Sequence, residues 1–418
     1  MLTVAYLANQ IPSPTEHYVT DEIEELRRRG ARVIACSART PAVVQPGDTS
    51  RPEIVLQKLH PLIFCRALWL LLSKVDRLWP LFRRVILGGN ESPATRIKGV
   101  AHTLLGACFA LRLKGQQVDH IHVHHGYFGS WIAMVAGRLL NIPFSMTLHG
   151  SDLLLHGVYL DTKLEECSFC LTISEFNRCF LIQKYPQVRD DKILVSRLGV
   201  EVVDKCPVSS NEGSPFTLLS VGRLHSTKDH AFLIRACIQA QRAGVDFQCL
   251  IAGEGPERRH LESLIEEGGL AGRVALLGHV PKEKMSSLYE GADVVVLTSR
   301  SEGIPLVLME AMAHGRIVLA PAITGIPELI VHGKNGFLFQ PGSVADCSEQ
   351  LLFLYSLMRS KDLADAGCLD WIRHAAQIQV RQNFNRKINL EAFASLFLER
   401  VEPRKDSLPH EDLVLQQI

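Results

Sequence analysis

Short apolar runs alternate with longer stretches of helical periodicity along almost the whole chain. Each run is only a few residues long and rich in Val, Ile and Leu, which is typical of strands buried on both faces of a parallel sheet. We expect strands at Leu2–Ala8, Ala31–Ser37, His120–His124, Phe144–His149, Cys170–Ser174, Ile193–Leu198, Phe216–Val221, Gln248–Ala252, Val274–Leu277, Asp293–Thr298, Ile317–Ala320 and Gly336–Phe339.

The stretches between these runs have the spacing of amphipathic helices. The clearest are Thr20–Arg29, His230–Ala243, Pro256–Glu267, Lys282–Tyr289 and Pro305–His314. Strands that alternate with helices predict an α/β fold, in which parallel sheets carry helices on both faces. A chain of 418 residues has room for two doubly wound domains of this kind.

A polar stretch rich in Pro, Gly and Ser divides the pattern into two similar halves. We expect a first domain at residues 1–199, an interdomain linker at 200–215, a second domain at 216–382 and a terminal helix at 383–401. Ligands of doubly wound sheets bind beyond the carboxyl ends of the strands. Two such domains facing each other therefore predict a central cleft.

The most informative segment runs from Glu302 to Glu310 and follows an apolar strand. Pro305 suits the first position of a helix, which puts Glu302 on the preceding loop and Glu310 inside the helix. Free amides at the helix start favour a phosphate, and carboxylates accept hydrogen bonds from neighbouring hydroxyls. A ligand with a phosphate centre and hydroxyl-rich ends, such as a nucleotide-sugar, would match this arrangement. The alternative is a polar loop residue and a solvated helical Glu, which the apolar surroundings disfavour.

Two cations follow another strand in the segment Gly222–Lys228. Gly222 permits a tight turn, and Arg223 and Lys228 could hold a diphosphate while negative charge develops on it. The alternative is a pair of surface cations.

Two glycine-containing turns follow further strands of the second half. The turn at Gly253 lacks the third glycine of a dinucleotide fingerprint, because Arg258 stands there, and a ligand-side turn or a plain turn would both fit. The turn at Val280 could offer backbone hydrogen bonds to a nucleobase edge.

Histidines gather at two strand ends in the first half. His120, His122 and His124 alternate along a strand and therefore share one face, where a metal site and a structural role are both open. His149 ends an apolar strand just before a glycine, where a residue of a cleft belongs. We favour a functional role for His149 over a structural one.

The overall composition is that of an ordinary globular protein, with a hydrophobic content of 47% and a net charge of +1. This balance gives no electrostatic reason to expect nucleic acid as a partner. The odd number of cysteines, eleven, and a start that resembles a strand rather than a secretory leader predict reduced thiols in the cytoplasm. Cys167 and Cys170, with Cys179 beyond, could bind a metal, but core packing is the expected role.

Residues 59–89 combine apolar side chains with basic ones and include Trp69 and Trp79. A basic helix with tryptophans can lie in a membrane interface, on the cytoplasmic face in this case. A helical pair packed on the domain explains the pattern equally well. The apolar runs are too short to span a bilayer.

These features together resemble the glycosyltransferase group 1 family, the retaining enzymes of the two-Rossmann-domain (GT-B) fold, over roughly Leu2 to Arg400. The resemblance implies that Glu302 and His149 lie at the transferred sugar, and that Glu310 contacts the nucleotide ribose. It implies that cations matching Arg223 and Lys228 bind the diphosphate. It further implies that the first domain binds the acceptor, that the second binds the nucleotide-sugar and that the last helix crosses back onto the first domain. It also implies backbone contacts from Gly303, Ile304, Pro305, Leu306 and Val307.

The segment Pro12–Ile23, which includes Glu16, resembles the opening loop of the colanic-acid and amylovoran branch, which builds bacterial surface polysaccharides. Val118–His124 and Ser174–Arg178 resemble the same branch. Many group 1 members carry paired glycines after the first strand, where this chain has Asn9–Pro12. Contacts from that loop to donor or acceptor therefore do not carry over.

Taken together, the sequence predicts metal-independent, retaining transfer of a sugar from a nucleotide-diphosphate donor to a hydroxyl of a lipid-linked or oligosaccharide acceptor. No Asp-x-Asp pair occurs to hold a divalent metal, and we expect no cofactor besides the donor substrate itself. Two alternatives remain at this stage: a nucleotide-sugar epimerase of the same fold, and a non-catalytic sugar-nucleotide-binding scaffold.

Overall fold

The computed structural model describes residues 1–13, 16–41, 51–203 and 215–402. The first sheet is parallel throughout, with the strand order β3-β2-β1-β4-β5-β6-β7. Its strands are β1 (Thr3–Ala8), β2 (Arg32–Ser37), β3 (Ile54–Val55), β4 (His120–His124), β5 (Phe144–Leu148), β6 (Cys170–Thr172) and β7 (Ile193–Val195).

The second sheet is also parallel, with the order β10-β9-β8-β11-β12-β13. Its strands are β8 (Phe216–Val221), β9 (Phe247–Ala252), β10 (Val274–Gly278), β11 (Val294–Val296), β12 (Ile317–Pro321) and β13 (Phe337–Phe339). In both sheets the order reverses beside the first strand, which makes each domain doubly wound. The predicted fold class is confirmed.

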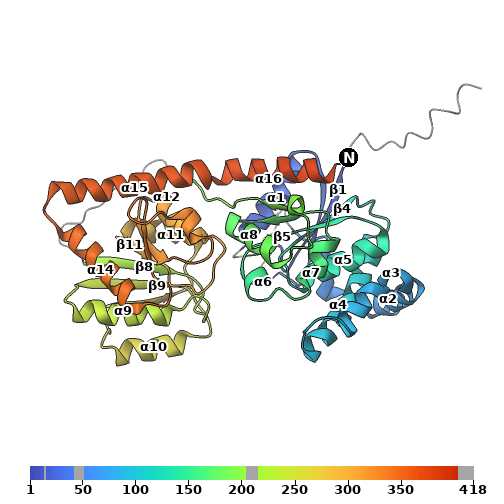
Figure 1. The fold of residues 1–418 in the computed structure, drawn as a ribbon, viewed down its shortest axis with the longest axis horizontal. Helices are drawn as coiled ribbons and strands as arrows, with labels where there is room; N and C mark the ends of the chain where they lie inside the picture. The colour runs from blue at the N-terminus through green and yellow to red at the C-terminus, as the bar shows by residue number, and fades with distance from the viewer. Residues whose placement is uncertain (14–15, 42–50, 204–214, 403–418) are drawn as a thin grey trace, which may run out of the picture.

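Helices cover both faces of each sheet, as the ribbon shows (Figure 1). The first domain contains α1 (His17–Arg28), α2 (Pro61–Ser73), α3 (Val75–Ile86), α4 (Pro93–Leu113), α5 (Phe128–Leu140), α6 (Ser151–Leu154), α7 (Leu160–Glu166) and α8 (Glu175–Lys184), with short 3₁₀ turns at Leu56–Lys58 and Asp190–Lys192. The second contains α9 (His230–Arg242), α10 (Arg258–Glu267), α11 (Lys282–Gly291), α12 (Leu306–Ala313), α13 (Ile326–Leu329), α14 (Val344–Arg359) and α15 (Leu363–Asn383), and α16 (Arg386–Val401) ends the described chain.

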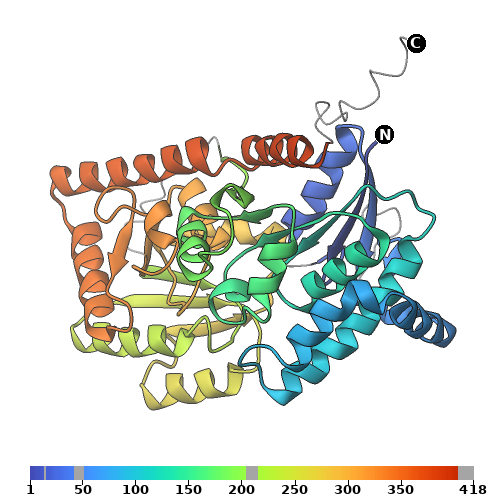
Figure 2. The ribbon, with the colours of Figure 1, turned by 45° about the vertical axis from the view of Figure 1, so that its right-hand side comes forward.

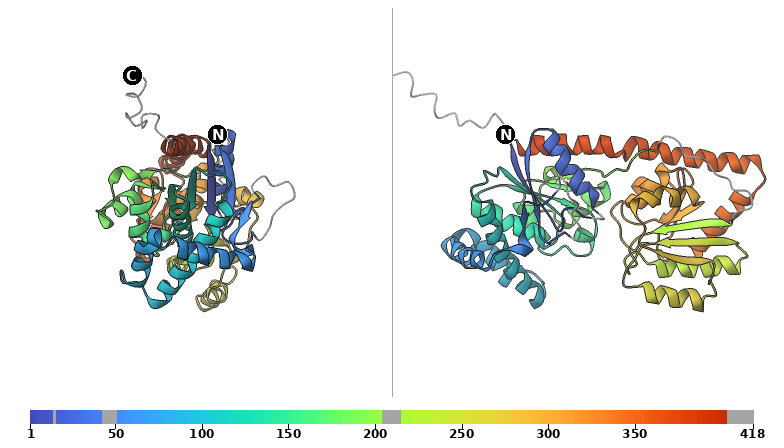
Figure 3. Two further views of the ribbon diagram at one scale, coloured as in Figure 1. Left: turned by 90° about the vertical axis from the view of Figure 1, so that its right-hand side faces the viewer. Right: turned by 180° about the vertical axis from the view of Figure 1, so that it is seen from behind.

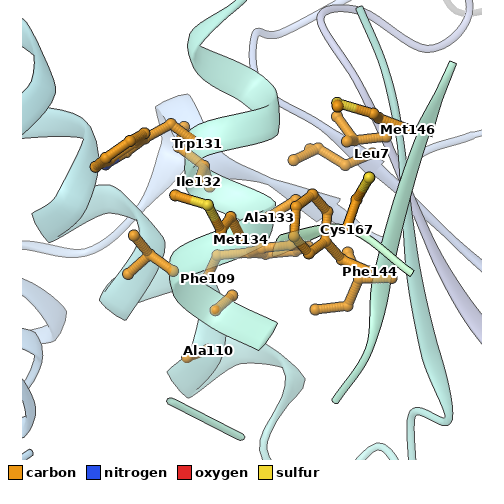
Figure 4. Close-up of a cluster of buried hydrophobic side chains, with 14 of the residues drawn as sticks. Leu7, Phe109, Ala110, Trp131, Ile132, Ala133, Met134, Phe144, Met146 and Cys167 are labelled. Carbon is orange, nitrogen blue, oxygen red and sulfur yellow. The ribbon is translucent and has the colours of Figure 1, made fainter. Parts of the chain in front are cut away.

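Side chains of β1 alternate between two hydrophobic cores, because successive residues of a strand point to opposite faces. Ala5 and Leu7 join the core beneath α4 and α5, while Val4 and Tyr6 join the core beneath α1 and α16. Burial on both faces explains why the strand is apolar throughout. Figure 4 shows the first of these cores, where Leu7 from β1 and Phe144 and Met146 from β5 lie beside side chains of α4 and α5.

The last two helices run along the length of the molecule from one domain to the other (Figures 1 and 2). α15 packs on the second domain through Ala376 and Val380, whereas α16 packs on the first through Phe393 and Phe397. The chain passes between the domains twice at this place, and the two crossings pair through an isolated bridge between Val200 and Asn385. Part of the stretch expected as a linker, residues 204–214, lies outside the described residues.

Cys167 and Cys170 are in the core of the first domain, as expected. Cys167 and Cys170 are buried, and burial raises the pKa of Cys167 to about 12, whereas Cys179 is exposed. The thiols of Cys167 and Cys170 therefore pack in the first domain. Among the described residues, every helix is too short or too polar to cross a bilayer.

Candidate functional site

Glu302 lies on the loop between β11 and α12, as its position after an apolar strand predicts. Its carboxylate forms an ion pair with Lys228 Nζ, and its backbone carbonyl accepts a 2.6 Å hydrogen bond from Thr324 Oγ1. Lys228 reaches Glu302 from the loop that follows β8, passing close beside Gly222. The two carboxyl-end loops next to the strand-order reversal of the second sheet are therefore joined by opposite charges.

Helix α12 starts at Leu306, one residue later than expected, and Pro305 is its N-cap residue. Pro305 has an extended backbone with φ −77° and ψ 121° and offers no side-chain cap. The first-turn amides of Leu306 and Val307 therefore lack a capping partner, and no hydrogen bond of the described chain uses the amides of Gly303 and Ile304. These amides and the positive end of the helix dipole favour an anion here.

The two domains touch backbone to backbone beside this loop. A Cβ added at Gly150 would lie 2.9 Å from the Gly303 amide nitrogen, and a Cβ at Gly303 would collide with the carbonyl oxygen of His149. Glycine is thus required on both sides of the contact. The contact brings the end of β5 in the first domain against the Glu302 loop of the second.

His149 is held in place from three directions. A 2.9 Å hydrogen bond joins its Nε2 to Nδ1 of His124, its carbonyl accepts from Asn177 Nδ2 at 3.0 Å, and its ring lies 4.8 Å from the ring of Tyr18. Burial lowers the pKa of His149 well below the usual range, and the charge of His125 lowers it further. The imidazole is therefore neutral at physiological pH and can exchange hydrogen bonds with a hydroxyl.

Asp152 sits beneath this turn, fully buried, and binds the backbone around it. Its carboxylate accepts hydrogen bonds from the amides of Gly126 (2.9 Å), Gly150 (2.8 Å) and His149 (3.1 Å). On its other side lies Nδ1 of His125, 3.7 Å away. Burial would raise the pKa of Asp152, but the hydrogen bond and charge of His125 outweigh burial and hold it below the ordinary value.

His125 stands between two carboxylates, because its Nε2 lies 3.1 Å from Oε1 of Glu16. Burial alone would lower its pKa, but Asp152 and Glu16 raise the pKa of His125 to about 10. Burial would raise the pKa of Glu16, but the hydrogen bond and charge of His125, with smaller effects from the charges of His124 and Arg223, together lower it. Arg223 is exposed on the second domain, so its field reaches across to the loop of Glu16 on the first.

Glu310 lies inside α12, as expected, and is half-buried. It accepts a 2.6 Å hydrogen bond from the hydroxyl of Tyr289 on α11. Burial raises the pKa of Glu310, although the Tyr289 bond and the charge of Lys282 partly counteract burial. No hydrogen bond or ion pair in the described chain joins Glu310 to the Glu302–Lys228 pair.

The turns predicted at Gly253 and Val280 lie along the same edge of the second sheet. Gly253 has φ 152°, and any Cβ there would collide with the carbonyl oxygen of Gly222. Its amide donates to Gly278 O at 2.8 Å, and Val280 follows two residues beyond β10. The ends of β8, β9 and β10 are thereby packed together beside Lys228.

The structure thus connects Glu302, Lys228, Gly222, Gly303 and His149 by direct contacts, and the charge of Arg223 acts on Glu16. Sequence reasoning missed His125 and Asp152 as members of this site. Asp152 carried one signal, since it follows the Gly150 turn directly. His125 carried none, because it looks like one more member of a histidine-rich strand.

The alternating histidines of β4 do share one face. His120 and His122 both bond Ser145 Oγ, at 2.7 and 2.8 Å, and His124 Nε2 lies 2.9 Å from Glu22. Atoms of His122, His124 and Glu22 lie close enough to hold a metal ion, but His120 is outside this group of described residues. Hydrogen bonds already account for each of the three side chains, so a structural network is the interpretation that the geometry favours.

The charge of His125 makes stability depend on pH in a defined direction. Its pKa of about 10 lies above the ordinary 6.5, so its contribution is complete below pH 6.5 and is lost as pH rises through 10. Buried Lys163, with a pKa lowered to about 7, acts in the opposite direction over this range. We expect His125→Gln to lower the free energy of unfolding. This loss should be about 3 kcal/mol smaller at pH 10 than at pH 6.5.

Urea denaturation of wild type and variant at several pH values measures this difference and cancels the common effect of Lys163. The surface substitution His260→Gln on α10 serves as the control and should cost little at any pH. A cost of His125→Gln that stays constant from pH 6.5 to pH 10 would contradict the assigned charge.

Both halves of the chain match sequence models of glycosyltransferases. A sequence model described as "Glycosyl transferases group 1" matches residues 205–365, and one described as "Glycosyltransferase Family 4" matches residues 15–203. The amylovoran biosynthesis glycosyltransferase AmsK of Erwinia amylovora is 30% identical over 318 residues, which cover 71% of this chain and 74% of AmsK.

The WcaL protein of Escherichia coli, named for colanic acid biosynthesis, is 34% identical over 213 residues, which cover 49% of this chain. The match spans about half the length of WcaL (51%). Among solved structures, sucrose-phosphate synthase of Thermosynechococcus elongatus superposes with a TM-score of 0.73 at 17% identity, covering 96% of this chain and 99% of that one. Anabaena HepE, solved with UDP-glucose, gives 0.69 at 19% identity, covering 96% and 100%. At such identities these structures support the fold.

Proposed function

The chain belongs to the group 1 glycosyltransferases, and from this premise we propose that it transfers a sugar from a nucleoside-diphosphate donor to a hydroxyl with retention of configuration. The observation that carries the proposal is the contact of Gly150 with Gly303, which brings the backbone of the His149 turn against the loop that carries Glu302, the ion-pair partner of Lys228. In this proposal the neutral His149, the acidic Glu302 and the basic Lys228 act at one point, where a sugar and its leaving group meet.

The donor occupies the edge of the second sheet in this proposal. Its diphosphate lies at the start of α12, where the amides of Gly303 and Ile304 are unused, and Lys228 turns from Glu302 toward the phosphates. Arg223, which is exposed and forms no ion pair with the described residues, supplies a second cation. Glu310 then accepts the ribose hydroxyls, and the turns at Gly253 and Val280 border the nucleobase.

The acceptor lies toward the first domain, where Glu16, His125 and Tyr127 surround the end of β4. The Tyr127 hydroxyl is 2.6 Å from Ser151 Oγ, and Glu16 faces the field of Arg223. These groups suit a polyhydroxylated acceptor, whether an oligosaccharide or a lipid-linked sugar. AmsK is named for amylovoran biosynthesis and WcaL for colanic acid biosynthesis, and these names support our proposal that this chain acts in exopolysaccharide synthesis.

The proposed reaction is a front-side substitution at the anomeric carbon. The bond from that carbon to the diphosphate oxygen breaks, the bond to the acceptor oxygen forms on the same face, and the acceptor proton passes to the leaving oxygen. Lys228 and Arg223 stabilise the charge that grows on the diphosphate, which is the role that a metal ion fills in other sugar transfers. Closure of the domains excludes water from the reacting centre.

A panel of nucleoside-diphosphate sugars tests the proposal, first by thermal shift and then by transfer to glycan acceptors in the presence of EDTA. We expect one donor to raise the melting temperature and to give, only with an acceptor, a product of unchanged anomeric configuration. Conversion of the donor without any acceptor would identify an epimerase. Inversion of the anomeric centre, or loss of transfer in EDTA, would refute retention or metal independence, respectively.

A further inference from the structure

Helices α2 and α3 pack on the first domain with one face and leave the other uncovered. Ala67 and Leu71 of α2, and Leu78, Leu81 and Val85 of α3, are buried in the core of the first domain. The expected packing of residues 59–89 on the domain is therefore observed, but it uses only one face of each helix. The pair lies at the end of the first domain that is farthest from the second domain (Figures 1 and 3).

The uncovered face of α2 is apolar. Leu62, Trp69 and Leu72 are exposed by 66%, 72% and 68%, and their spacing of seven and three residues places them on one side of the helix. Leu68 lies beside them and is also exposed. Single exposed apolar residues need no explanation, but a continuous row of large ones marks a surface that binds something.

The uncovered face of α3 is also apolar. Val75, Trp79 and Ile86 share one side of that helix, and Trp79 is exposed by 61%. Ile97 at the start of α4 adds a further exposed apolar side chain near the same end of the domain. We call the exposed side chains of these three helix segments the end face, which comprises Leu62, Leu68, Trp69, Leu72, Val75, Trp79, Ile86, Leu87, Ile97 and Val100.

The charge around the end face has one dominant sign, unlike the chain as a whole. Between Leu59 and Ala101 the acidic residues are Asp76 and Glu91, and Glu91 is bound to Arg84. The basic residues of the same stretch are Arg66, Lys74, Arg77, Arg83, Arg84, Arg96 and Lys98. The chain carries a net charge of only +1, so cations are concentrated here beside the apolar row.

We propose that the end face binds the surface of an anionic phospholipid bilayer. Tryptophan rings suit the level of the lipid headgroups, leucines enter the acyl boundary, and Arg66, Arg77 and Arg83 meet the anionic headgroups. In this proposal the end face lies in the headgroup layer of the bilayer. A second copy of this chain is the competing occupant, but like charges on the two copies would repel each other.

Vesicle flotation of the full chain tests this without donor or acceptor, so the result is independent of the proposed activity. Wild type should float with vesicles of phosphatidylcholine and phosphatidylglycerol and bind neutral vesicles far more weakly. We expect the double substitution Trp69→Ser and Trp79→Ser to lower partitioning into anionic vesicles at least tenfold. Arg66→Gln should lower it about fivefold. High salt should weaken the binding of the wild type to a similar extent as Arg66→Gln, because it screens the same attraction.

Two control variants come from exposed residues of the second domain, Trp371→Ser on α15 and Arg242→Gln on α9, and both should float like wild type. Equal binding of wild type and the double tryptophan variant would overturn the proposal. So would wild-type dimers in light scattering that the same variant converts to monomers, because that result assigns the end face to a second copy.

Discussion

Replacing Glu302 with glutamine is expected to lower kcat by about a thousandfold, close to the full effect of losing one electrostatic contact at a transition state. Lys228 holds the Glu302 carboxylate, and the hydroxyl of Thr324 holds the backbone carbonyl of Glu302. Glutamine has nearly the same shape as glutamate but no charge. In the proposed reaction positive charge grows on the sugar as the leaving group departs. A neutral amide stabilises that charge poorly.

Initial rates over a range of donor concentrations separate the effect on kcat from an effect on KM. Donor affinity, measured by calorimetry, should change less than tenfold, because the diphosphate and ribose contacts remain. Glu266→Gln on the exposed side of α10 is the matched control and should leave both constants unchanged. A Glu302→Gln enzyme that turns over within threefold of the wild-type rate would remove Glu302 from the reacting centre.

A double-mutant cycle with Lys228→Met tests whether the ion pair acts as a unit. In the proposed reaction Lys228 contacts the diphosphate and Glu302 the sugar, so their losses should be nearly additive and the double variant should be less active than either single variant. A double variant that is no less active than Glu302→Gln alone would mean that the ion pair acts as a unit.

The sheet core could be predicted because its strands are buried on both faces and therefore apolar throughout. Expected and observed bounds agree for β4 and β8, and the other predicted strands differ by a few residues at their ends. β3 was missed because it consists only of Ile54 and Val55 at the edge of the sheet, where two residues set no periodicity. Strand ends differ because the last residues, such as His149 after β5, leave the ladder to enter the site.

The second-domain half of the site was easier to predict than the first-domain half. Glu302, Glu310 and Lys228 are charged residues at strand ends or in an apolar helix, which sequence patterns reveal. His125 differs, since its role depends on carboxylates 109 residues earlier and 27 residues later in the chain, Glu16 and Asp152. The reversal of strand order next to β4 brings those groups together, and the sequence around His125 does not reveal that reversal.

The last prediction concerns Asp152, whose substitution should affect the fold and the site together. We expect Asp152→Asn to destabilise the first domain by about 3 to 5 kcal/mol at pH 7, the usual cost of removing one partner of a buried ion pair. The pKa of Asp152 is lowered, so its contribution is complete above the ordinary value of 3.8 and is lost only as pH falls through the folded value. Neutral pH therefore reveals the whole effect.

The physical reason is that an amide cannot replace this carboxylate. Three backbone amides and the His125 ring point at it, and the NH₂ group of asparagine would face a donor at one of these places. Urea denaturation compares the variant with Asp119→Asn, whose exposed carboxylate accepts one amide bond from Thr3 at 2.7 Å and should cost about 1 kcal/mol. Equal costs for the two substitutions would show that Asp152 does not anchor the His149 turn, and the His149–Gly303 contact would then need another support.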